Sequence, residues 1–77
     1  MALSRKDALA RLQHLKPRVE EHVQKIAANP ASESQAHWIH EVNNWLTQMA
    51  NVAPHTGKKT SAEWLKRIEA WKRQIES

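Results

Sequence analysis

The chain has 77 residues, no cysteine, one glycine, no phenylalanine or tyrosine, and a formal net charge of +4 with neutral histidines. A chain of this length makes one small domain, and without cysteine neither a disulfide nor a thiolate metal site can stabilise it. Charges among the first twelve residues argue against a signal peptide, and no stretch reaches the about 18 apolar residues of a membrane span, so we expect a cytoplasmic protein without membrane contact.

The composition favours helices throughout, because Ala, Leu, Glu, Lys, Gln and Arg dominate and strand-forming aromatic residues are scarce. We therefore predict an all-α fold, namely a small antiparallel three-helix bundle with a tryptophan-rich core. Residues 1–77 are expected to form a single helical domain, with helices at about 4–28, 33–52 and 61–76.

The first predicted helix begins at Ser4, an N-cap residue followed by Asp7 in the first turn, and ends before Pro30. Its apolar residues fall on one stripe at helical spacing, formed by Ala8, Leu9, Leu12, Leu15, Val19, Val23 and Ile26. Pro17 lies away from this stripe. We predict one helix kinked at Pro17, with a second short helix starting at Pro17 as the alternative.

The second predicted helix opens with Ser32 and Gln35, which have the spacing of a capping box. Its apolar stripe consists of Trp38, Ile39, Val42, Trp45, Leu46 and Met49. The opposite face carries polar residues without formal charge, at His37, His40, Asn44, Thr47 and Asn51. This segregation is the clearest amphipathic pattern in the chain.

A loop at residues 53–59 is predicted to lead to a third helix, with Thr60 and Glu63 as its capping box. The apolar stripe of this helix consists of Trp64, Leu65, Ile68, Trp71 and Ile75. Both later helices thus carry two tryptophans seven residues apart. We expect these indoles to add buried apolar area to a small core, on the order of 200 Å² each; exposure of one indole for a partner is the alternative.

Catalysis is not expected, because the serines and threonines are accounted for by helix caps and polar faces and no nucleophile motif is present. His37 and His40 lie one turn apart, but a zinc site needs three or four ligands. We expect Glu41 to point to another side. No metal or cofactor is therefore predicted, and His22, at the edge of the first stripe, is expected to pack against an indole.

Basic residues of the third helix offer one alternative function. Lys59, Lys66 and Arg73 are spaced by seven residues and form a line opposite the tryptophan stripe. Together with Lys58 this line could follow a nucleic-acid backbone without reading sequence. Against it, Glu63 and Glu69 border the line and can pair with Arg67 and Arg73 at i,i+4 spacing.

The leading interpretation is a small non-enzymatic interaction module that presents one helix face to a protein partner or to its own copy. The face we predict is His37, His40, Asn44 and Thr47, because it lacks charge and can dock without burying unpaired ions. The alternative is non-specific nucleic-acid binding through Lys58, Lys59, Lys66 and Arg73.

Overall fold

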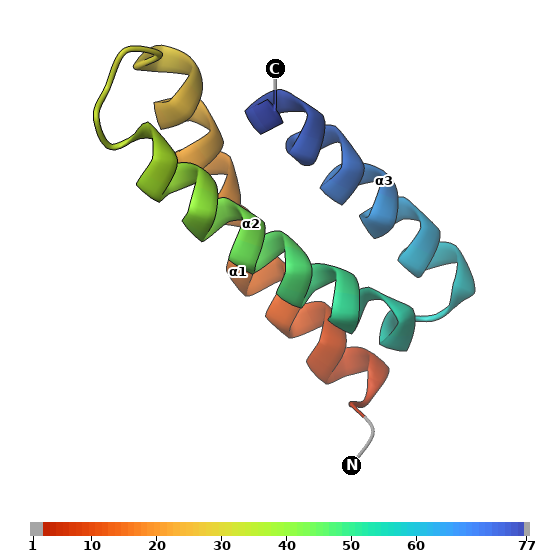
Figure 1. Ribbon diagram of the computed structural model, residues 1–77. Coiled ribbons are helices and arrows are strands. Elements are labelled where there is room, and N and C mark those ends of the chain that lie inside the picture. Colours follow the sequence, from red (N-terminus) through yellow and green to blue (C-terminus); the bar gives the residue numbers. More distant parts are fainter. Residues whose placement is uncertain (1–2, 77) are drawn as a thin grey trace.

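The computed structural model describes residues 3–76, which form three α-helices and one short 3-10 helix, with no strand among them (Figure 1). The helices are α1 (Arg5–Ala28), α2 (Gln35–Val52) and α3 (Lys58–Glu76), and η1 (Ala53–Thr56) follows α2 directly. The radius of gyration is 13.1 Å, far below the about 27 Å expected for an unfolded chain of this length. The prediction of a small all-α protein with three helices is confirmed.

Helix α1 begins as predicted. The Ser4 side chain accepts a hydrogen bond from the Asp7 N–H at 3.1 Å, which satisfies one of the free amides of the first turn. The helix continues through Pro17, which is exposed, so the alternative of a second helix starting there is wrong. Six of the seven predicted stripe residues are buried, and Leu9 is half-buried.

The connection between α1 and α2 differs from the predicted capping box. Ser32 Oγ accepts from the Ser34 N–H at 3.1 Å, and Ser34 itself occupies the N-cap position. The Gln35 amide Nε2 donates instead to the Ile26 and Asn29 carbonyl oxygens, both at 2.7 Å. Gln35 therefore satisfies carbonyls left free at the end of α1, and α2 begins two residues later than the predicted residue 33.

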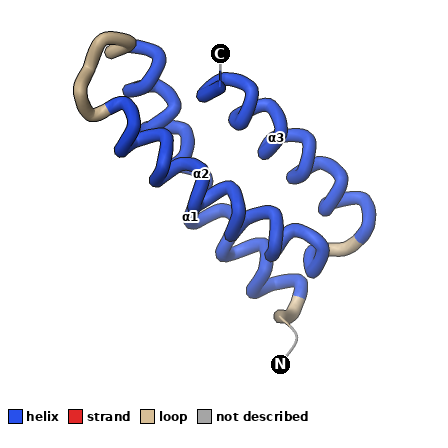
Figure 2. Tube along the Cα trace, viewed as in Figure 1, coloured by secondary structure: helices blue, strands red, loops and turns tan. Residues whose placement is uncertain are grey.

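The connection between α2 and α3 is shorter than predicted (Figure 2). Residues Ala53–Thr56 continue as η1, and α3 starts at Lys58 rather than at residue 61, so Thr60 lies inside the helix and does not cap it. The break falls at Gly57, whose φ of 97° lies in the left-handed region that favours glycine. The single glycine of the chain thus provides the turn.

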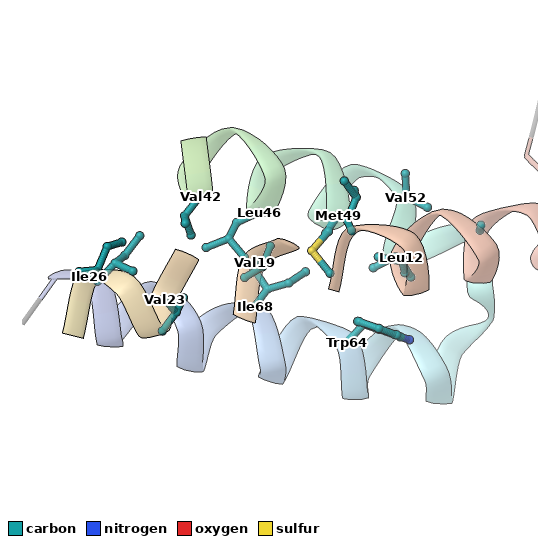
Figure 3. Packing of buried hydrophobic residues seen from close by; sticks show 14 residues of the cluster. Leu12, Val19, Val23, Ile26, Val42, Leu46, Met49, Val52, Trp64 and Ile68 are labelled. Carbon is teal, nitrogen blue, oxygen red and sulfur yellow. The ribbon is translucent and has the colours of Figure 1, made fainter. Parts of the chain in front are cut away.

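The buried side chains come from all three helices and meet in one cluster (Figure 3). The largest fully buried members are Leu12, Val19, Val42 and Met49, from α1 and α2. Trp64 of α3 is 7% exposed, whereas Trp38, Trp45 and Trp71 are half-buried and pack against the cluster. Leu65 is 43% exposed, so its predicted place in the buried stripe is wrong.

Candidate interaction surface

The α2 polar face (His37, His40, Asn44 and Thr47) lies exposed along one side of α2, as its spacing requires. In its middle, Asn44 Nδ2 lies 3.5 Å from His40 Nε2. Thr47 Oγ1 donates to the Asn43 carbonyl oxygen at 2.9 Å. Each of these side chains can both donate and accept hydrogen bonds, so the face can pair with polar groups of either kind.

One border of this face meets α1 through a cluster of His22, His37 and Glu41. Glu41 Oε1 lies 2.6 Å from His37 Nε2, and its Oε2 lies 3.5 Å from His22 Nε2 on α1. The expectation that Glu41 points to another side is therefore wrong. Each oxygen of the Glu41 carboxylate, the one carboxylate of α2, therefore faces an imidazole, and the Glu41 side chain is 32% exposed.

His22 fixes the position of this cluster on α1. Its ring meets the Trp45 indole edge-on, with ring centroids 4.7 Å apart and an interplanar angle of 88°, as favoured by the aromatic quadrupole. This contact confirms that His22 packs against an indole. Nδ1 lies 3.1 Å from the Arg18 carbonyl oxygen. The His22 ring thus contacts Trp45, the Arg18 carbonyl and Glu41 at the same time.

The other border of the α2 polar face meets α3 at an open hollow of about 120 Å³. We call this the α2–α3 hollow; it is lined by Asn43, Leu46, Thr47, Ala50, Ile68 and Lys72. Leu46 and Ile68 are buried and Ala50 is half-buried, while Asn43, Thr47 and Lys72 are exposed. The hollow therefore combines apolar side chains with polar groups and one cation.

Charge is distributed unequally among the helices. All twelve lysines and arginines lie within residues 5–25 and 58–73, so α2 contains none. Its one acidic residue is Glu41. Depletion of charge, and of lysine in particular, is a compositional mark of the centre of a protein interface.

The basic positions of α3 are all exposed. Lys58 and Lys59 lie in its first turn, and Lys66 lies near its middle. None of these three makes an ion pair within residues 3–76, whereas Arg73 Nε lies 3.8 Å from Glu69 Oε1. Arg67 does not pair with Glu63; its guanidinium lies over the Trp64 ring, 5.1 Å from the centroid.

Within residues 3–76, no three His, Cys, Asp or Glu side chains form a group that could hold a metal ion. No helix in this range combines the length and apolar character needed to cross a membrane. No protein-family model, curated protein or solved structure matches the chain.

The sequence pattern did not predict two features of this surface, the Glu41–His22 contact and the exposure of Leu65. The contact of Glu41 with His22 joins residues from different helices, and helical spacing within α2 alone cannot reveal it. The position of Leu65 had a local signal: it lies 100° from Trp64 and only about 20° from Lys72 on a helical projection. That angle places Leu65 at the edge of the α3 stripe, beside a charged residue.

Proposed function

We propose that the protein is a small non-enzymatic interaction module whose α2 polar face binds a protein partner or a second copy. The single observation that carries this proposal is the distribution of charge: α2 has no lysine or arginine, and its one carboxylate already contacts two histidines. A partner that covers His37, His40, Asn44 and Thr47 therefore leaves no unpaired ion buried, which would otherwise oppose binding strongly.

The framework we propose for this module is an antiparallel three-helix bundle with a tryptophan-rich core. The chain turns back at each connection in Figure 1, which supports the antiparallel order. Trp64 is buried and the other three indoles pack at the border of the apolar cluster. In such a bundle α2 has one neighbour on each flank, so its polar face points outward between them.

A pair of charge-introducing variants tests the proposal. The immobilised chain is incubated with cell extract, and the proteins retained by wild type, Asn44→Lys and Gln24→Lys are compared. Gln24 is exposed on α1, away from the buried stripe, so its variant adds the same charge elsewhere. We expect a protein, or the chain itself, to be retained by wild type and Gln24→Lys and lost by Asn44→Lys. Equal retention by all three contradicts the proposed face.

A second candidate function is non-specific nucleic-acid binding through Lys58, Lys59, Lys66 and Arg73. The observation that favours it is the absence of an ion pair at three of these residues within residues 3–76. Such binding weakens steeply with salt, because each neutralised phosphate releases counterions. Fluorescence anisotropy of labelled DNA and RNA at about 50 and 200 mM salt, with wild type and the double variant Lys66→Glu, Arg73→Glu, measures it; no binding at low salt excludes it.

A further inference from the structure

On α3, the residues that line the α2–α3 hollow lie close to an exposed apolar side chain, Leu65. Leu65, at 43%, is the one exposed large apolar side chain among residues 3–76. It precedes Ile68 by three residues and Lys72 by seven, so all three lie on one flank of α3. Ile68 and Lys72 line the hollow, and Leu65 therefore lies about one helical turn from it.

The hollow and Leu65 each have a charged residue nearby, Lys72 at the hollow and Glu69 near Leu65. Lys72 lies at the hollow and makes no ion pair within residues 3–76. Glu69 follows Leu65 by four residues, its side chain is 63% exposed, and its contact with Arg73 is long at 3.8 Å. The exposed leucine is thus flanked by an anion and the hollow by a cation. A surface that fits Leu65 and Glu69 needs a hollow beside a cation, and a surface that fits the hollow and Lys72 needs a leucine beside an anion. This chain carries both surfaces, so a second copy fits it.

We propose that the α2–α3 hollow is filled by Leu65 of a second copy of the chain, in a dimer with twofold symmetry. Each Leu65 enters the other copy's hollow, and each Glu69 meets the other copy's Lys72. Twofold symmetry repeats every contact, so one leucine and one hollow per chain are sufficient and the assembly closes at two. The two symmetric Glu69–Lys72 pairs oppose the repulsion between two chains that each carry a charge of +4.

This inference rests on the proposed function and identifies the partner as a second copy. Sedimentation velocity of the full chain over about 5–500 µM should show a concentration-dependent shift from 8.9 kDa to twice that mass. Leu65→Ala removes the inserted side chain, and Ala50→Leu fills the hollow from within. We expect each to raise the dimer dissociation constant at least about tenfold, with helical content unchanged by circular dichroism. Ala70→Leu, at an exposed position elsewhere on α3, should have no effect.

A charge exchange tests the pairing itself. Glu69→Lys and Lys72→Glu should each weaken the homodimer, because each places two like charges at both symmetric contacts. In an equimolar mixture of the two variants, every contact pairs opposite charges again, so a heterodimer should form. Lys66→Glu, the same reversal elsewhere on α3, should leave dimerisation unchanged.

A wild-type chain that stays monomeric at the highest concentration overturns the inference, as does a mixture that fails to restore association. If the chain is monomeric but still retains another protein that Asn44→Lys loses, the second copy is the wrong partner and the proposed function stands. If neither association nor selective retention is found, both fail.

Discussion

Helix α2 meets α1 along one seam and α3 along another, and the two seams are packed differently. Toward α1, aliphatic side chains are fully buried, and the border is closed by the His22–Trp45 contact and the Glu41 carboxylate. Toward α3, Leu46, Ala50 and Ile68 line an open hollow, and Leu65 remains exposed. The α1 stripe consists of aliphatic side chains, whereas the α3 stripe combines two large indoles with Ile68 and Ile75, and the small Ala50 lines the hollow. Side-chain shape, more than hydrophobicity, therefore determines which seam closes.

The largest expected difference in the free energy of unfolding is between truncating a buried side chain of α1, Leu12, and truncating one of α3, Ile68. Leu12→Ala removes a fully buried leucine and should cost about 2–5 kcal/mol, close to the roughly 3–5 kcal/mol that a core of this size supplies. Ile68→Ala should cost less, because the space it leaves joins the hollow and admits water. Urea unfolding followed by circular dichroism measures both. Equal losses would show that the two seams are packed alike.

Replacing an alanine with leucine should change stability in opposite directions at Ala8 of α1 and at Ala50 beside the α2–α3 hollow. Ala8 is 0% exposed, and Ala8→Leu should destabilise the fold by about 1–3 kcal/mol through overpacking. Ala50→Leu places the same added carbons in the hollow and should stabilise the chain by about 0.5–2 kcal/mol. Thermal unfolding at a few micromolar, where self-association is weakest, gives both values. Destabilisation by Ala50→Leu would mean that the hollow cannot accept an aliphatic group.

The aromatic contact between α1 and α2 can be isolated with a double-mutant cycle. His22→Ala and Trp45→Leu should be coupled by about 0.5–1.5 kcal/mol, the usual contribution of an edge-on aromatic pair beyond its buried area. The control cycle replaces His22→Ala with His14→Ala, two turns earlier on α1, and should be additive. Additivity in both cycles would show that His22 and Trp45 do not interact in solution.

The smallest expected effect concerns a contact within α3, between Arg67 and Trp64. The Arg67 guanidinium covers the Trp64 ring, and Arg67→Ala should cost about 0.5–1 kcal/mol through loss of the cation–π contact. Arg67→Lys keeps a cation on the same helix and should recover part of this loss. Urea unfolding of the three proteins in parallel measures it. A Lys variant as unstable as the Ala variant would assign the effect to the planar guanidinium over the ring, because lysine keeps both a positive charge and an aliphatic stem.

Much of the local structure followed from the sequence alone. Helical composition, the Ser4 cap and the regular stripe of α1 specify a helix through interactions between residues at most four positions apart. The α2 polar face was likewise predictable, because residues three and four apart share a side of any helix. The predicted capping box at Ser32 failed because the Gln35 amide donates to carbonyls at the end of α1 instead. The one at Thr60 failed because α3 already starts at Lys58, directly after Gly57.

The tertiary structure alone decided how the three helices meet. Whether Glu41 contacts His22, whether Leu65 is covered, and whether a hollow remains between Leu46 and Ile68 depend on the distances between separate helices. Helical periodicity gives the direction of each side chain around its own axis and contains no information about those distances. Those distances follow from the shapes of the side chains packed between the helices. The sequence therefore determined which residues share a face of each helix, and the tertiary structure determined which of these residues meet across two helices.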